Sequence, residues 1–193
     1  MKLINFKSAL KILKSGSPVI FPTDTLPAIG CLPNFSNIIY EFKKRDRNNP
    51  LILMGSDYKQ LIDYVHKSAK EDFKNIASKY WPGALTIVIP VSDKKTAILT
   101  STDLTLGLRI PNSFMAQSLM KATGPLLTSS ANISGQKGAI TAAGIALDFP
   151  SIEILGPIPW EKSSGKASTI ISWKKSGDWM LIREGEVLIR ELF

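Results

Sequence analysis

The spacing of apolar residues along this chain predicts where its helices and strands lie. Apolar residues three and four positions apart within 5–15 predict a helix that stops at Gly16. The short apolar run 19–21 predicts a buried strand that ends at Pro22. Both patterns recur along the rest of the sequence, so helices and strands should follow one another throughout.

The same reasoning predicts the remaining elements. Further helices are expected over 34–44, 56–65, 67–80, 141–149 and from Asn112 or Ser113 to Ala122. Further strands are expected over 51–54, 85–90, 104–110, 125–128, 152–155, 167–172, 179–183 and 187–190. Helical crossovers favour parallel pairs, and the short links late in the chain favour antiparallel ones. We therefore expect an α/β fold with a mixed sheet, and one domain over 1–193, because no linker or repeat interrupts the pattern.

Composition adds limits on class and compartment. A single cysteine excludes an internal disulfide and favours a reducing compartment. No segment approaches the length of a membrane span, and the first residues lack a signal-peptide core, so a cytoplasmic location is expected. The 24 Lys and Arg against 16 Asp and Glu give a net charge of +8, which favours anionic partners such as nucleotides or nucleic acid.

Several chemistries are excluded by the residues present. One histidine, His66, and one cysteine, Cys31, cannot build a structural zinc site, and no G-x-S-x-G motif marks a serine hydrolase. The sequence also lacks a P-loop and a Rossmann fingerprint. If the protein binds a nucleotide, it uses another arrangement.

Polar residues collect at the ends of apolar strands, where α/β sheets form their ligand sites. The sequence 21–27 places Asp24 between two threonines, a pattern that, taken alone, favours a turn over a ligand site. Four cations within 43–47 suit a helix C-terminus, but the strand that follows at once favours an anion site over a solvated charge run.

Two further segments carry polar groups that could contact an anion. Arg109 lies between apolar residues, which indicates either a structural salt bridge or a carboxylate clamp. The loop 128–135 carries hydroxyl and amide groups that could surround phosphate oxygens, although a plain loop has the same composition.

Taken in order, these segments resemble the YrdC/Sua5 family of threonylcarbamoyl-AMP synthases, over about residues 8–190. The matching motifs are Pro22-Thr23-Asp24-Thr25, Lys43-x-Arg45 with Asn49-Pro50-Leu51, Trp81-Pro82-Gly83-Ala84-Leu85-Thr86, Leu108-Arg109-Ile110-Pro111, Ser130-Ala131-Asn132, Ser168-Thr169 and Arg183-x-Gly185. The length resembles the short, single-domain form. The resemblance implies a YrdC-like twisted open sheet of mixed parallel and antiparallel strands flanked by helices.

The resemblance also implies a reaction. Members join L-threonine, bicarbonate and ATP into threonylcarbamoyl-adenylate and pyrophosphate, and a partner complex then transfers the threonylcarbamoyl group to adenosine 37 of tRNA. Holding three anions and stabilising the leaving pyrophosphate needs basic and hydroxyl groups rather than a protein nucleophile. Mg²⁺ would bridge the phosphates, without metal ligands from protein side chains.

Roles follow by similarity. Lys43 and Arg45 would be catalytic. The ATP-binding residues would be Arg45, Asn49, Thr105, Ser130, Asn132 and Arg183, and the threonine-binding residues would be Thr25, Arg109, Thr128 and Ser168. The chain departs from the family pattern at Pro27, Ala28 and Met54, near the expected threonine pocket. The competing hypothesis is a basic module of the same fold that binds tRNA or double-stranded RNA without synthase activity.

Overall fold

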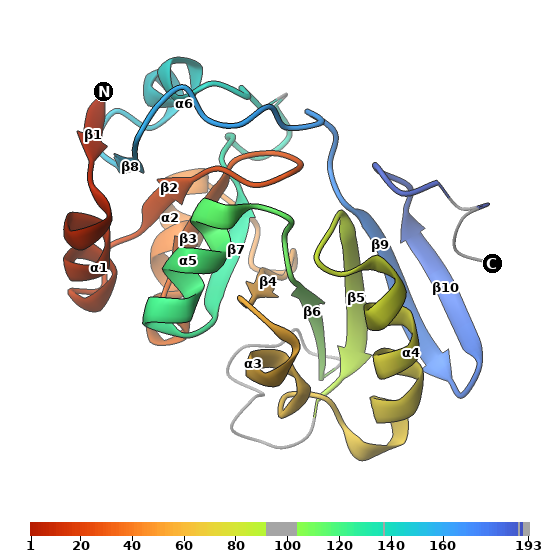
Figure 1. Cartoon of the computed structure of the whole chain (residues 1–193). Coiled ribbons are helices and arrows are strands. Elements are labelled where there is room, and N and C mark those ends of the chain that lie inside the picture. The colour runs from red at the N-terminus through yellow and green to blue at the C-terminus, as the bar shows by residue number, and fades with distance from the viewer. Residues whose placement is uncertain (92–103, 137, 189, 191–193) are drawn as a thin grey trace.

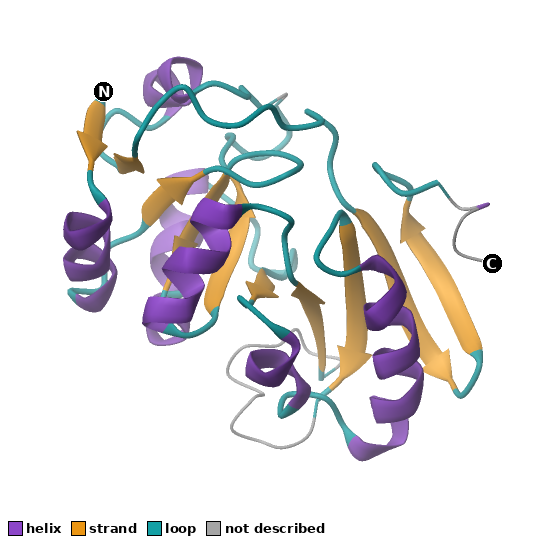
Figure 2. Cartoon of the chain, viewed as in Figure 1, coloured by secondary structure: helices purple, strands orange, loops and turns teal. Residues whose placement is uncertain are grey.

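The structure is a computed structural model that describes residues 1–91, 104–136, 138–188 and 190. Its helices are α1 (Phe6–Lys14), α2 (Asn37–Lys43), α3 (Tyr58–Ile62), α4 (Lys70–Tyr80), α5 (Phe114–Thr123) and α6 (Ala142–Asp148), with 3-10 turns at Pro33–Phe35 and Lys67–Ala69. Its strands are β1 (Lys2–Ile4), β2 (Val19–Phe21), β3 (Ala28–Cys31), β4 (Ile52–Met54), β5 (Leu85–Pro90), β6 (Thr105–Arg109), β7 (Leu126–Ser130), β8 (Glu153–Leu155), β9 (Thr169–Lys175) and β10 (Asp178–Arg183). Helices and strands alternate along much of the chain (Figure 2).

The strands form one sheet in the order β1-β8-β2-β3-β7-β4-β6-β5-β9-β10 (Figure 1). The pairs β1/β8, β2/β8, β4/β6 and β5/β9 are parallel, and the other neighbours are antiparallel. The expected open sheet of mixed strand direction, flanked by helices, is therefore confirmed. Strands β8 and β9 are consecutive in sequence but lie near opposite ends of the sheet, so segment 156–168 crosses between the two ends.

The two faces of the sheet pack against different helices. Successive residues of a strand point to opposite faces. Val19 and Phe21 of β2 pack in one apolar cluster with residues of α1 and α5, whereas Ile20 packs in a second cluster with residues of α2, α3, α4 and α6. Both faces are thus covered at the β2 end of the sheet.

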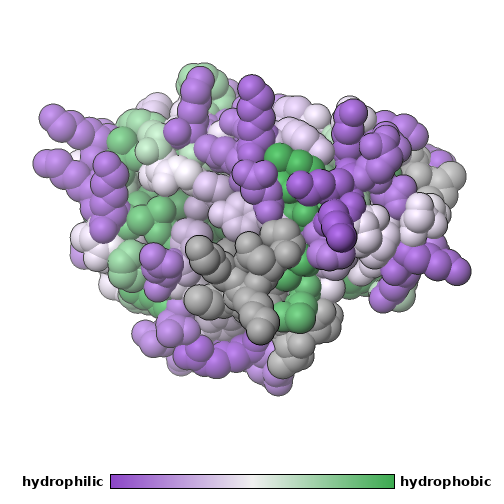
Figure 3. Space-filling model, turned by 90° about the horizontal axis from the view of Figure 1, so that it is seen from below, coloured by the Kyte–Doolittle hydropathy of each residue, from purple (hydrophilic) through white to green (hydrophobic). Residues whose placement is uncertain are grey.

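The pattern changes toward β6. Leu106 and Leu108 enter the cluster shared with α4, while Thr105, Gly107 and Arg109 face the side on which α1 and α5 lie farther along the sheet. The described residues leave a cavity there in place of a packed core. On the surface seen from below, hydrophilic side chains project around much of the outline, with hydrophobic residues between them (Figure 3).

Some element predictions were wrong. Strands β1 and β3 were missed, because each is only three or four residues long and β3 contains Gly30. The predicted helix 34–44 divides into a 3-10 turn and α2, and helix 56–65 is reduced to α3. The strand predicted over 187–190 is not formed at Val187 and Leu188. The Val187 carbonyl accepts a hydrogen bond from Thr169 Oγ1 instead of from a neighbouring strand. Residue 189 lies outside the described residues. None of the helices that the structure describes is long and apolar enough to cross a membrane.

Candidate functional site

A cavity of about 640 Å³ lies over the face of the sheet that runs from β3 to β10. Its wall comes from strands far apart in sequence and from the loops after α2 and before β9. Nine of the eleven predicted site residues line it, namely Thr25, Arg45, Asn49, Thr105, Arg109, Thr128, Ser130, Ser168 and Arg183. The fold thus brings together the segments that sequence reasoning singled out separately.

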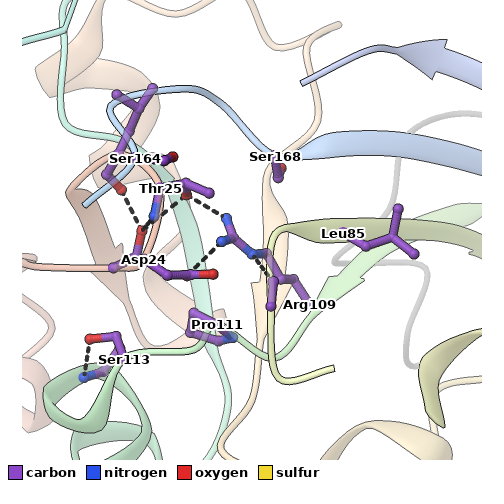
Figure 4. Close-up of polar contacts among 12 residues, drawn as sticks. Asp24, Thr25, Leu85, Arg109, Pro111, Ser113, Ser164 and Ser168 are labelled. Atoms are coloured by element: carbon purple, nitrogen blue, oxygen red, sulfur yellow. Dashed lines mark hydrogen bonds and ion pairs between the residues drawn. The ribbon is translucent and has the colours of Figure 1, made fainter. Parts of the chain in front are cut away.

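Arg109 ends β6 and is buried, with 2% of its surface exposed. Its guanidinium donates from Nη2 to Asp24 Oδ1 at 2.7 Å, from Nη1 to Thr25 Oγ1 at 2.8 Å and from Nε to the Gly83 carbonyl at 3.0 Å (Figure 4). These bonds use three of its five N–H donors, and the described residues supply no partner for the other two. Arg109 therefore forms the expected structural salt bridge, and the carboxylate clamp stays a prediction.

Two more arginines, Arg45 and Arg183, line the cavity. Arg45 donates to the carbonyls of Asn49 and Pro50 at 3.0 and 3.2 Å. Arg183 donates to the Ser168 carbonyl from both Nε and Nη2, at 3.2 and 2.8 Å. Neither guanidinium forms an ion pair with a carboxylate of the described residues. Burial lowers the pKa of both groups, and the charge of Arg45 lowers that of Arg183 further, so a bound anion would relieve the repulsion.

Hydroxyl groups line the cavity between the arginines. Thr25 Oγ1 accepts from Arg109 and lies 3.1 Å from Thr23 Oγ1. Thr128 Oγ1 donates to the Ile52 carbonyl at 3.0 Å. Ser168 Oγ lies 2.8 Å from Thr86 Oγ1. These contacts fix each hydroxyl oxygen in the cavity wall.

Lys43 and Asn132 do not line the cavity, but both bind the loop that carries the lining residue Ser130. Lys43 is 1% exposed, and its ammonium donates to the carbonyls of Ser130 and Asn132. The Asn132 amide donates to the carbonyls of Ile133 and Gln136, at 2.9 and 2.7 Å, and its Oδ1 accepts from Ser130 Oγ. Together they fix the loop that carries Ser130 against the end of α2.

The rest of the basic cluster points elsewhere. Lys44 caps α2 in the left-handed conformation, with φ 49°, and is exposed. Arg47 donates to Asn37 Oδ1 at 2.7 Å and lies over the Tyr40 ring, 5.6 Å from its centroid. Neither lines the cavity, so only Arg45 of the four cations in 43–47 reaches it.

Some cavity residues were not predicted. Thr86 and Ser172 add hydroxyls, Lys174 adds a cation and Gly107 forms part of the floor. Neither β5 nor β9 alternates apolar and polar residues, so local pattern gave no signal for the first two. Among the described residues, the lining contains no carboxylate, histidine or cysteine. This composition suits binding and charge stabilisation of an anion.

Comparison with known proteins gives a consistent result. The family of Sua5, YciO and YrdC, described as "Telomere recombination", matches residues 11–185. Over 145 residues the chain is 32% identical to the threonylcarbamoyl-AMP synthase of Pyrococcus abyssi, covering 73% of this chain and 42% of that protein. Over 143 residues it is 31% identical to the threonylcarbamoyl-AMP synthase of Vibrio campbellii, covering 71% of this chain and 77% of that protein.

A solved structure agrees over nearly the whole chain. The crystal structure of P. abyssi Sua5 complexed with L-threonine superimposes with a TM-score of 0.89 at 29% identity, covering 99% of this chain and 59% of that one. The chain thus spans about three fifths of that protein and about three quarters of the Vibrio relative.

Proposed function

The chain belongs to the Sua5/YciO/YrdC family, and we propose that it is a threonylcarbamoyl-AMP synthase. The threonine amine and bicarbonate would form a carbamate with loss of water, and a carbamate oxygen would attack the α-phosphorus of ATP. Pyrophosphate then leaves, and threonylcarbamoyl-adenylate remains. The observation that carries this proposal is the cavity itself, in which three arginines and a hydroxyl wall meet without a carboxylate in the described lining.

We assign the amino acid to the Arg109 end of the cavity. The two N–H donors that remain on Arg109 suit the two oxygens of a carboxylate. Thr25, Thr128 and Ser168 would border the rest of the threonine. The solved complex of a relative with L-threonine supports an amino-acid pocket in this fold.

We assign the nucleotide to Arg45, Asn49, Thr105, Ser130 and Arg183. Arg45 and Arg183 would stabilise the charge that develops on the α-phosphate and on the departing pyrophosphate. Lys43 and Asn132 would act through the Ser130 loop, which they hold in place. Arg45 is therefore the catalytic residue of the Lys43-x-Arg45 pair, and Lys43 positions the site.

A Mg²⁺ ion would come with the ATP. The described residues contain no group of three or more His, Cys, Asp or Glu that could hold a metal. A magnesium ion coordinated by phosphate oxygens and water needs no such group, so the residues fit an ion carried by the nucleotide. It would neutralise the part of the phosphate charge that the arginines do not neutralise.

The product would serve tRNA modification through a separate transfer complex, and the protein would act in the cytoplasm. The adenylate is a mixed anhydride, so another protein must protect it from water or receive it promptly. The net charge of +8 favours contact with anionic partners such as tRNA.

The proposal is tested by pyrophosphate release from the purified protein. Release should require ATP, L-threonine and bicarbonate together, and omission of any one should abolish it. A protein that binds RNA in a salt-sensitive manner but releases no pyrophosphate with all three substrates would support the binding-module hypothesis instead.

A further inference from the structure

Gly107 lies in the middle of β6 and forms part of the cavity floor. Ile52 of β4 and Val88 of β5 are its direct register partners on the two sides. Both of these side chains also line the cavity. The floor is therefore an apolar strip three strands wide, with a side chain missing at its centre.

The protein itself does not require glycine at this position. Gly107 is not among the residues with positive φ, so its backbone suits any residue. A Cβ atom built there would meet Ile52 Cγ1 and Thr86 Cγ2 at 3.5 Å and Val88 Cγ2 at 3.8 Å, which are ordinary van der Waals distances. Gly30 of β3 differs, because a Cβ there would meet Phe21 Cε1 at 2.8 Å. Packing explains Gly30 and leaves Gly107 unexplained.

Glycine in a strand interior has a cost, because it loses more conformational entropy on folding and packs no side chain. Where neither backbone conformation nor crowding requires it, close approach of a ligand is the remaining reason. Gly107 is two residues from Arg109 and two from Thr105, so about 7 Å of strand separates it from each. These are the residues assigned above to the amino acid and to the nucleotide.

We propose that Gly107 sets the depth of the cavity beneath the junction of the two substrates and thereby determines which ligands the site admits. The inference rests on the proposed function, because it places the carbamate and the α-phosphate above this residue. A side chain here would raise the floor at that point. The amino acid and the nucleotide could then still bind singly, but the joined arrangement would be excluded.

The test is a size series at one position, Gly107→Ala, Gly107→Val and Gly107→Leu. The midpoint temperature of thermal unfolding without ligand should be unchanged or slightly raised in each variant. The kcat/KM for pyrophosphate release should fall a few-fold for Ala and by roughly 10- to 100-fold or more for Val and Leu, as overpacking of a close contact predicts. Affinities for ATP alone and threonine alone, measured by calorimetry, should change less than turnover.

A second substitution separates clearance from folding. Val88→Ala in the Gly107→Val background removes side-chain volume from the neighbouring position of the cavity floor. The double variant should therefore recover part of the lost turnover. A stable Gly107→Val variant with wild-type kcat/KM would overturn the inference while leaving the proposed function intact. A loss that follows reduced thermal stability and is not relieved by Val88→Ala would also overturn it. Absence of turnover in the wild type would instead overturn the proposed function, and the inference with it.

Discussion

Asp24 and Arg109 form an ion pair of 2.7 Å between the loop after β2 and the end of β6. The pair fixes the direction of a buried guanidinium, and the Thr25 hydroxyl and Gly83 carbonyl complete its fixed side. Arg109 can then present its remaining donors to the cavity without rotating. Asp24 thus holds in place the arginine that we propose binds the carboxylate of the amino acid.

Asp24→Ala should leave the Arg109 charge buried and unpaired. Breaking a buried pair in this way costs on the order of 3 kcal/mol, which urea unfolding would measure. The KM for threonine should also rise. Asp24→Asn should retain the Oδ1 acceptor, so both its loss of stability and its rise in KM should be smaller. Equal stability for wild type and Asp24→Ala would show that the ion pair contributes nothing to folding.

Arg45 and Arg47 provide a matched pair within one basic cluster, because only Arg45 reaches the cavity. Arg45→Ala should reduce kcat/KM for ATP by roughly 100-fold, as loss of a charged contact to phosphate predicts. Arg47→Ala should leave it within about two-fold, because exposed charges are screened by solvent. Equal effects at both positions would mean that the cluster acts through general charge rather than through a placed guanidinium.

Lys43 should make stability depend on pH in the alkaline range. Burial, reinforced by the charge of Arg45, lowers the pKa of Lys43 from 10.5 to about 8. Between these values the unfolded chain binds more protons than the folded chain, so stability rises with pH. Relative to Lys43→Met, the free energy of unfolding of the wild type should rise by about 3 kcal/mol across this window. Below about pH 7 the difference in the free energy of unfolding between the two proteins should be constant. Urea unfolding of both proteins at several pH values measures that difference, and a flat difference across the window would contradict the prediction.

Cys31 should be chemically inert in the folded protein. Burial raises the pKa of its thiol to about 12, and it is fully buried in β3. At pH 8 only about one thiol in ten thousand would be ionised, and the thiolate is the reactive species. A thiol reagent should label the protein only after denaturation. Rapid labelling of the native protein would show that the β3 region opens.

Much of this arrangement was predictable from local pattern. In 104–110 the alternation of Leu106 and Leu108 with Thr105 and Arg109 predicts a strand with one core face, and β6 has that form. Strand ends supplied the predicted site, and nine of its residues line one cavity. The family resemblance supplied the roles, which residue types alone left open.

The direction of individual side chains was not predictable. Within 43–47 the charges look equivalent in sequence, yet Lys43 turns inward to the Ser130 loop and Lys44 turns outward. The cause is the end of α2 at Lys43, after which Lys44 adopts a left-handed conformation. The partner of Lys43 lies 87 residues away, and no local pattern identifies a contact over that separation.

The crossing of segment 156–168 has a consequence for biosynthesis. The cavity takes residues from Thr25 to Arg183, and β9 pairs with β5 only after this segment has been made. A growing chain emerges at about 5–20 residues per second, so the β2, β3 and β7 region can be assembled seconds before Ser168 and Arg183 are available. A nascent chain that stalls before β9 would therefore hold the Asp24–Arg109 pair but would lack Ser168 and Arg183 from the cavity wall.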